Sequence, residues 1–459
     1  MEMILDLRTL LEILPDAQPS GLSGHEQFDL INIAHLKQFE SLPHVERTLY
    51  FCVYEDFPDD AGWYKYSFDR SLNIDKLKSD ARVVFVIDDR VPFGRIMGTP
   101  HIRVNSIFRA VDLIRQYVLD RIRPRVVGVT GSVGKTTTAA LLQHVLATRF
   151  GCGRVYSKRL TPLTLSSWLV NFLEEANKML VLEYSMYRKN HIGILTNLLP
   201  PEIGIFLNVR RMHLGVEGVH TLDDIIEGKR ALVDGSRLAI LNVDDQLVLS
   251  LRRKQDLMFS LRDSDADAFL FQRGDEATVV FKWSEQRITF APYLKTDLFY
   301  RQVLATCLTA SALGIPQELL REALNTFHPA ENRIGWVEID GQRAIFDGDV
   351  TAAGRLASLA EHRYSSSVLM VHSFDFGDEN VELQQDDFNR VFSAFTVVRV
   401  LDTEENRAIA SRYSLKHLIF TTKKEFCSGL NKFEFKILHF ATYFRKHADL
   451  SFLKSFIAT

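Results

Sequence analysis

One glycine-rich segment, residues 126–138, has residue types suited to holding phosphate. It reads VVGVTGSVGKTTT, so an apolar β-branched stretch leads through a glycine-rich turn into the helix-forming stretch 139–146. Glycines let the backbone N–H groups of such a turn converge on phosphate oxygens, and the N-terminus of the following helix adds partial positive charge. In a nucleotide-binding loop Lys135 would neutralise the β- and γ-phosphates, and the Thr136 hydroxyl would hold Mg²⁺. The segment therefore predicts a strand, a phosphate-binding loop and a helix.

The spacing of the glycines differs from the commonest P-loop pattern. That pattern has a glycine five residues before Gly134, where this chain has Val129; its own glycines are Gly128 and Gly131. An ordinary glycine-rich turn between a strand and a helix is the alternative interpretation. The Gly-Lys-Thr sequence at the expected start of a helix favours the nucleotide loop.

Three further polar residues follow apolar stretches that are typical of buried strands. Glu183 closes the stretch 179–183, His213 comes shortly after the stretch 203–208, and Lys229 follows sixteen residues later. The crevice at the carboxyl ends of parallel strands is the usual ligand site, so Glu183 could be a second protein ligand of Mg²⁺. Alone, each has an ordinary alternative: a salt-bridge glutamate, a hydrogen-bonded surface histidine and a solvated lysine. Their combination with the loop favours a common site.

Length, charge and cysteine content restrict the class of protein. The 459 residues are 46% hydrophobic and 25% charged with only 13 prolines, which indicates a globular chain of about three domains. The net charge of −3 gives no general basic field for nucleic acid or an anionic membrane. The four cysteines are far apart and indicate buried or incidental thiols in a reducing compartment. The acidic N-terminus and the absence of an apolar run of about eighteen residues predict a cytoplasmic protein.

Residues 1–123 are expected to form an N-terminal, substrate-binding α/β domain. The stretches 49–53 and 82–87 are strand-like, and 106–122 has helical periodicity. Pro124 disfavours continuation of that helix, so the boundary is placed there.

Residues 124–328 are expected to form the central nucleotide-binding domain. Apolar strands without alternation, separated by helical stretches, predict a mainly parallel sheet covered on both faces. The period shifts towards two between 269 and 292, which predicts a short antiparallel addition, and a helical pair is expected over 298–327. The expected parallel strands are 126–130, 179–183, 203–208 and 238–242.

Residues 329–459 are expected to form a third α/β domain with its own sheet. Strand-like stretches alternate with helical ones in this part of the chain. The expected strands are 368–371, 397–401 and 418–420.

The central residues resemble the Mur ligase family of ATP-dependent amide-bond ligases, most closely its D-alanyl-D-alanine-adding members. The similarity spans nearly the whole chain but is specific only in the central domain. The similar segments are the loop at 130–137 (TGxxGKTT in the family), the strand-end Glu183, the prolines at 200–201, the segment 208–214 (N-x-x-x-A/D-H-L), the helix at 221–229, the strand end at 241–245 (LNxDD) and Arg333 near the start of the C-terminal domain.

This resemblance implies a three-domain architecture with a central P-loop ATPase domain and a Rossmann-like C-terminal domain. It implies a ligase that uses ATP to phosphorylate a carboxylate and then joins the acyl phosphate to an amine. Metals and cations must surround the transferring phosphoryl group. One Mg²⁺ would lie on Thr136 and Glu183 and a second near His213. A carbamylated Lys229 would support the second, because an unmodified ammonium would repel it.

The resemblance also assigns roles to individual residues. The catalytic set is Lys135, Glu183, His213 and Lys229. The nucleotide contacts are the loop residues Gly131, Ser132, Val133, Gly134, Lys135, Thr136 and Thr137, together with Gln302 near the adenine, Asp347 at the ribose and Arg333.

The substrate regions depart from the family pattern. The early segment that contacts the UDP part of the substrate corresponds to 31–36 and lacks both polar anchors, and the segment 156–162 retains only its proline. We therefore expect a monomeric ligase for another small-molecule or peptide carboxylate and amine. One alternative is a true UDP-N-acetylmuramoyl-tripeptide–D-alanyl-D-alanine ligase of peptidoglycan synthesis. Another is a non-catalytic nucleotide-binding P-loop protein that binds a partner.

Overall fold

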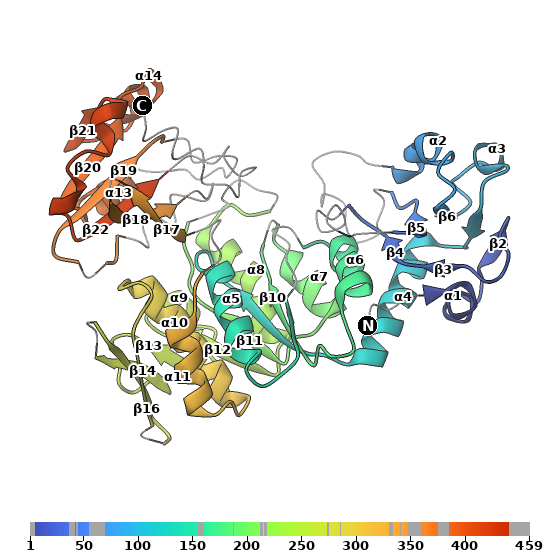
Figure 1. Cartoon of the computed structure of the whole chain (residues 1–459). Helices are drawn as coiled ribbons and strands as arrows, with labels where there is room; N and C mark the ends of the chain where they lie inside the picture. The colour runs from blue at the N-terminus through green and yellow to red at the C-terminus, as the bar shows by residue number, and fades with distance from the viewer. Residues whose placement is uncertain are drawn as a thin grey trace. The chain divides into compact units, whose positions relative to one another are not determined.

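A computed structural model shows a mixed α/β chain (Figure 1). The chain divides into two compact units. The first unit is Met1–Val127, Phe150–Ser185 and Ile194–Pro200, and the second is Gly128–Arg149, Met186–Gly193 and Pro201–Thr459. The structure describes residues 5–35, 42, 45–54, 69–154, 160–186, 188–211, 214, 218–272, 275–284, 286–329, 334–339, 341–347, 360–362, 364–374 and 385–439.

The N-terminal part of the first unit is built on a five-stranded sheet in the order β2-β7-β6-β5-β4. Its strands are parallel except for β2, which runs antiparallel to β7. The expected strands at 49–53 and 82–87 are confirmed. The bounds are β2 Gln18–Ser20, β4 Leu30–Asn32, β5 Thr48–Phe51, β6 Val83–Ile87 and β7 His101–Arg103, with a separate pair β1 Leu5–Asp6 and β3 Gln27–Phe28.

The expected helix over 106–122 is α4, Ile107–Ile122. Its N-cap is Ser106, whose hydroxyl accepts a hydrogen bond from the Arg109 N–H at 3.3 Å. It ends at Arg123, which has a left-handed backbone (φ 49°), directly before Pro124. The α4 helix packs against α6, Pro162–Phe172. The other helices of this region are short: α1 Leu7–Ile13, α2 Ile74–Leu77 and α3 Phe93–Ile96.

The central sheet has nine strands in the order β16-β15-β14-β13-β12-β11-β8-β10-β9. The pairs from β11 to β14 are parallel, as is the pair of β9 with β10. The hairpins β14-β15 and β15-β16 are antiparallel, which confirms the expected addition. The bounds are β8 Arg125–Thr130, β9 Cys152–Arg154, β10 Met179–Glu183, β11 Ile203–Phe206, β12 Leu238–Asn242, β13 Leu257–Ser260, β14 Ala268–Gln272, β15 Ala277–Phe281 and β16 Arg287–Phe290.

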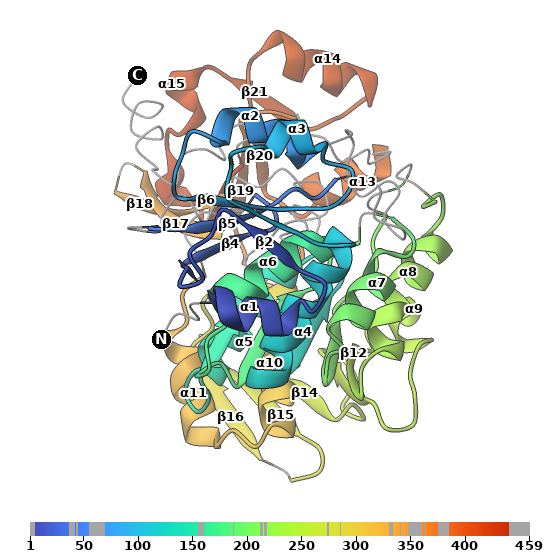
Figure 2. The same ribbon diagram turned by 90° about the vertical axis from the view of Figure 1, so that its right-hand side faces the viewer.

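The expected helical pair is α10, Asp297–Ala312, and α11, Gln317–Thr326. Every residue of α10 from Asp297 to Ala310 is buried. It packs against α5, Lys135–Leu146, and against the strands β12, β13 and β14 (Figure 1 and Figure 2). The α10 helix therefore lies in the core of the second unit, between α5 and these strands. The other described helices between residues 124 and 328 are α7 His191–Leu198, α8 Leu222–Asp234 and α9 Gln246–Leu249.

A six-stranded sheet in the order β17-β18-β22-β19-β20-β21 forms the C-terminal part of the second unit. All of its pairs are parallel except β17-β18. Its own apolar core includes Met370, Phe426 and Leu438. This confirms the expected third sheet, whereas the domain limits at 123/124 and 328/329 stay a prediction. The bounds are β17 Ile334–Ile339, β18 Gln342–Asp347, β19 Ser367–Val371, β20 Val397–Leu401, β21 Leu418–Thr421 and β22 Phe435–His439, with α13 Gln385–Phe392, α14 Glu404–Arg412 and α15 Lys423–Phe426.

Two further expectations concern thiols and membranes. All four cysteines are free, and Cys52, Cys307 and Cys427 are buried, as expected. Burial raises the pKa of Cys52 to about 12, which keeps that thiol protonated. Within the described residues, no helix is both long enough and apolar enough to cross a membrane.

Candidate nucleotide-binding site

The glycine loop lies between β8 and α5, as predicted. Gly131 and Gly134 both have positive φ angles, 147° and 95°. A Cβ atom at Gly131 would lie 3.0 Å from the Leu207 Cβ, and one at Gly134 would lie 2.9 Å from the Gln302 Nε2. Both positions therefore favour glycine for their backbone conformation; a Cβ at Gly131 would also crowd the Asn208 backbone, and one at Gly134 would displace the Gln302 amide.

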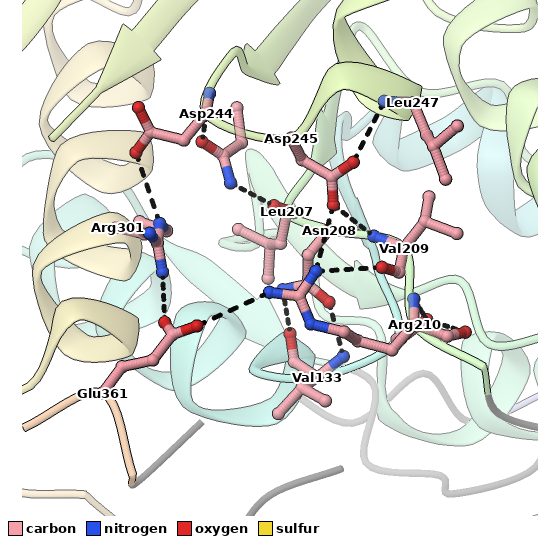
Figure 3. A network of polar contacts seen from close by, with 12 residues as sticks. Val133, Leu207, Asn208, Val209, Arg210, Asp244, Asp245, Leu247, Arg301 and Glu361 are labelled. Carbon is pink, nitrogen blue, oxygen red and sulfur yellow. Dashed lines mark hydrogen bonds and ion pairs between the residues drawn. The ribbon is translucent and has the colours of Figure 1, made fainter. Parts of the chain in front are cut away.

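Asn208 fastens this loop to the segment that follows β11. Its side-chain Oδ1 accepts from the Val133 N–H and its Nδ2 donates to the Val133 carbonyl, both at 2.9 Å (Figure 3). Its carbonyl also accepts from the Ser132 N–H at 3.0 Å. Asn208 is only 4% exposed, so these are buried hydrogen bonds. The sequence match at 208–214 included this residue but gave it no role, because its partners lie 75 residues away.

Lys135, the first residue of α5, folds back over the loop. Its Nζ donates to the Gly131 carbonyl at 2.7 Å and to the Ser132 carbonyl at 3.2 Å. Lys135, Thr136 and Thr137 are all half-buried, so they keep access to solvent. The predicted phosphate-binding lysine thus lies at the mouth of the loop.

Lys229 approaches the same loop from α8. Its side chain is buried, and its Nζ donates to the Gly131 carbonyl at 3.3 Å. The helix is fixed at its start by a capping box of Thr221 and Asp224. The structure thus brings together two predicted site residues that are 94 positions apart in the chain, Lys135 and Lys229.

Gln302 reaches the loop from α10. It is 3% exposed, and its Nε2 donates to the Gly134 carbonyl at 3.4 Å. On the same helix Leu298 packs against Val133. The amide therefore contacts the loop backbone, and its predicted place near an adenine stays a prediction.

A chain of charged residues lies beside the loop (Figure 3). The Arg301 guanidinium on α10 donates to Glu361 at 2.7 Å and to Asp244 at 3.4 Å. Burial alone would lower the pKa of Arg301, but the carboxylates of Glu361, Asp244 and Asp297 outweigh it and raise that pKa. Glu361 also lies 4.0 Å from the Arg210 guanidinium, so it joins two arginines.

The predicted Mg²⁺ ligands are oxygen donors of a suitable kind. Thr136 lies in the first turn of α5 and Glu183 is the last residue of β10, and both are half-buried. The structure describes them in separate compact units. Among the described residues, no three His, Cys, Asp or Glu side chains gather to hold a metal. Mg²⁺ usually takes one or two protein oxygens together with phosphate oxygens and water, and each of these side chains is an oxygen donor of that kind.

Several predicted site residues lie outside the described part of the chain. These are His213, Arg333 and most of the segment 156–162. Asp347 is described only through its backbone, as the last residue of β18.

The segment corresponding to the family's UDP contact is bonded within the protein. Asn171 on α6 accepts from the Ile31 N–H at 2.8 Å and donates to the Ile31 carbonyl at 2.9 Å. The Arg70 guanidinium donates to the Asn32 side chain at 2.6 Å and to the Asn32 carbonyl at 3.0 Å. Ile31 and Ile33 are buried, so this segment presents mainly satisfied or apolar groups.

The comparisons with known proteins agree on one family. Residues 129–294 match the Mur ligase middle domain, a range that includes the loop, α8 and the strand end at Asp244. The UDP-N-acetylmuramoylalanine–D-glutamate ligase of Symbiobacterium thermophilum is 28% identical over 281 residues, 57% of each chain. The UDP-N-acetylmuramoyl-tripeptide–D-alanyl-D-alanine ligase of Haemophilus influenzae is 27% identical over 188 residues, 39% of each chain. The chain thus spans less than two thirds of the length of these relatives.

Solved structures extend the likeness to the whole fold. MurF from Acinetobacter baumannii has a TM-score of 0.74 at 15% identity and covers 99% of both chains. MurF from Thermotoga maritima in complex with ADP has a TM-score of 0.65 at 17% identity, over 90% of this chain and 94% of that one.

The fold is therefore that of the multidomain Mur ligases. Residues 129–294 match the Mur ligase middle domain, and the resemblance of the chain to the Mur ligase family is confirmed, with MurF proteins among its sequence relatives and its structural neighbours.

Proposed function

We propose that this protein is an ATP-dependent Mur-type ligase that joins a carboxylate to an amine through an acyl phosphate. The observation that carries the proposal is the glycine loop at the start of α5, with the Lys135 and Lys229 side-chain nitrogens on one loop carbonyl. A helix N-terminus and a cation both favour phosphate binding, and this loop lies at the N-terminus of α5 beside the Lys135 ammonium group. The ligation chemistry is carried over from the Mur ligase relatives.

Lys135 is poised to exchange partners when a nucleotide binds. Its Nζ now donates to two carbonyls of its own loop, and phosphate oxygens are stronger, charged acceptors. The carboxylate oxygen attacks the γ-phosphorus and ADP leaves. The amine then attacks the acyl carbon, and phosphate leaves with one oxygen of the original carboxylate. Bound to Thr136 and Glu183, Mg²⁺ would neutralise charge on the transferring phosphoryl group.

Lys229 is proposed to act as a carbamate. The ammonium group would first lose a proton; the neutral amine nitrogen would then attack CO₂, form a C–N bond and lose a second proton. This replaces a buried cation by an anion able to support a second metal near His213. The carbamate nitrogen keeps one N–H, so the hydrogen bond to the Gly131 carbonyl can persist. Turnover that rises with added bicarbonate and falls in a Lys229→Ala variant would support this role, and bicarbonate-independent turnover would contradict it.

The proposed substrate is a small-molecule or peptide carboxylate other than the standard UDP-muramoyl peptide. The argument is the state of residues 31–33, where the Ile31 backbone and the Asn32 amide are held by Asn171 and Arg70. Groups that are already hydrogen-bonded bind a polar nucleotide weakly, because the existing bonds must first be broken.

A second candidate is a true MurF-type ligase of peptidoglycan synthesis. The observation in its favour is the match to MurF over 99% of both chains. A third, a non-catalytic nucleotide-binding protein, is disfavoured by Lys229, since nucleotide binding alone would not need a buried second lysine at the loop. The three domains, a monomeric state and the cytoplasm remain predictions.

Phosphate release from Mg-ATP distinguishes these candidates. UDP-muramoyl tripeptide and D-alanyl-D-alanine are supplied together, and each is omitted in a control. Release only with other acids and amines supports the proposal. Release that requires both, with the joined product seen by mass spectrometry, identifies a MurF-type ligase. ATP binding without turnover for any pair favours the non-catalytic candidate. Lys135→Ala or Glu183→Ala should abolish product formation, and full activity in either variant would contradict the assignment as a ligase.

A further inference from the structure

Asp245 holds two separate parts of the second unit with one carboxylate. It lies just after β12 and caps the short helix α9, where its Oδ1 accepts from the Leu247 N–H at 3.1 Å. Its Oδ2 accepts from the Val209 N–H at 2.9 Å and pairs with the Arg210 guanidinium at 3.3 Å. The side chain is 10% exposed. Asp245 therefore ties the segment after β12 to the segment after β11 (Figure 3).

The peptide unit between Asn208 and Val209 transmits this contact to the glycine loop. Its N–H donates to Asp245, and its carbonyl accepts from the Ser132 N–H at 3.0 Å. A peptide unit is a rigid plane, and a trans unit points its N–H and its C=O in opposite directions. Ser132, the peptide unit and Asp245 therefore form a continuous hydrogen-bond chain. A carboxylate acceptor paired with an arginine polarises and strengthens the next bond of such a chain, here the one at the loop.

The next residue repeats the connection. The Arg210 N–H donates to the Ser132 Oγ at 2.8 Å. The Arg210 Nη1 donates both to the Val209 carbonyl at 3.0 Å and to Asp245, so it neutralises the carboxylate and fixes the neighbouring peptide unit. Two successive peptide units thus depend on Asp245 and Arg210, and both units bond to Ser132.

We propose that Asp245 is a positioning residue for the nucleotide loop. It fixes the position and orientation of the Ser132–Val133 backbone without touching the nucleotide. This inference rests on the proposed function, because it assigns a consequence for nucleotide binding. The sequence match at 241–245 gave Asp245 no role, since its partners are in another segment.

Asp256 provides a matched control. It directly precedes β13, and its side chain contacts the start of β12. Its carboxylate accepts from the Ala239 N–H at 3.0 Å and pairs with the Arg253 guanidinium at 2.9 Å. It is buried, whereas the Asp245 side chain is 10% exposed, and it also joins a backbone N–H of another segment to an arginine. Within the described part of the chain, the hydrogen bonds of its partners Ala239 and Arg253 do not reach the glycine loop.

The experiment compares the full chain with its Asp245→Asn and Asp256→Asn variants. An asparagine keeps one acceptor and loses the charge, so both variants should have a lower Tm. Mg-ATP binding is measured by calorimetry. We expect the Kd to rise at least tenfold in Asp245→Asn and to stay within twofold of wild type in Asp256→Asn.

Equal Kd values in the two variants would overturn the inference. If the wild-type chain does not bind Mg-ATP, the proposed function fails instead, and the two failures are thereby distinguished. If Asp245→Asn does not fold, Arg210→Met decides: it removes the guanidinium that neutralises Asp245 and holds the Val209 carbonyl, and so loosens the second of the two peptide units bonded to Ser132. A Kd raised several-fold at a Tm close to that of wild type supports the inference, and an unchanged Kd overturns it.

Discussion

Lys135 and Lys229 both donate to the carbonyl oxygen of Gly131, at 2.7 Å and 3.3 Å. While Lys229 is unmodified, the two ammonium groups on this oxygen repel each other, more strongly where burial lowers the local dielectric. An anion at the loop mouth would relieve this repulsion by drawing Lys135 outward, whereas Lys229 is buried and stays. The arrangement is therefore matched to an arriving phosphate.

Gly134→Ala should weaken Mg-ATP binding more than it lowers stability. The new Cβ would have a positive φ and would lie 2.9 Å from the Gln302 amide and 3.2 Å from the Leu298 Cδ1. Gly341→Ala is the control, since Gly341 also has a positive φ but a Cβ added there would have no other atom within 4 Å. The positive φ alone costs about 1–2 kcal/mol. Calorimetry should show weaker nucleotide binding only for Gly134→Ala; the same loss in both variants would contradict the close-packing account.

Asn208→Ala should lower both stability and nucleotide affinity. It removes both hydrogen bonds to Val133 and leaves two buried backbone groups unpaired, at a cost of about 2–4 kcal/mol. Asn171→Ala removes the same pair of bonds from Ile31 and is the control. We expect both variants to have a lower denaturation midpoint, and only Asn208→Ala to have a raised Kd for Mg-ATP. A raised Kd in both would refute a specific role for Asn208.

The sequence could predict individual strands but not the contacts between distant segments. The apolar stretches at 179–183 and 238–242 correspond to β10 and β12 with the same bounds, because a buried parallel strand is a local pattern. The contacts of Asn208 with Val133 and of Lys229 with Gly131 span 75 and 98 residues. Such contacts depend on strand order and register, which local patterns do not fix.

The resemblance to a family supplied the roles of Lys135 and Lys229 but not their shared acceptor. It matched the aspartates at 244–245 as part of a strand-end pattern but assigned them no role. In the structure Asp244 pairs with Arg301 and Asp245 with Arg210. A motif reports which residues recur at a strand end, whereas their partners are set by the packing of α10 and the segment after β11.

Glu361→Gln should destabilise the second unit. Arg301 is 8% exposed and would keep its charge while losing its nearest carboxylate, at 2.7 Å. Removing one partner of a largely buried ion pair costs about 1–3 kcal/mol where the remaining charge keeps a second partner, here Asp244. Asp402→Asn breaks the exposed pair with Arg407 and should leave the denaturation midpoint unchanged. Equal midpoints for the two variants would show that Glu361 contributes no such stability.

Glu26 should make the first unit sensitive to acid. Burial alone would raise the pKa of Glu26, but hydrogen bonds from Ser23 and from the Gly24 N–H outweigh it and lower that pKa to about 2. A carboxyl with a lowered pKa in the folded state stabilises above its unfolded pKa of 4.5, and this contribution is lost as the pH falls from there towards 2. Glu26→Gln should therefore lower the denaturation midpoint at pH 7 and much less near pH 3. A pH-independent difference would contradict this linkage.

The fate of the carboxylate oxygen tests the central claim most directly. Any carboxylate and amine pair that supports phosphate release is supplied with Mg-ATP and an ¹⁸O-labelled carboxylate, and the products are analysed by mass spectrometry. An acyl-phosphate ligase transfers one labelled oxygen to the released phosphate and forms ADP and an amide, all of which should be lost in Lys135→Ala. Label in AMP, or unlabelled phosphate beside an amide product, would contradict the account.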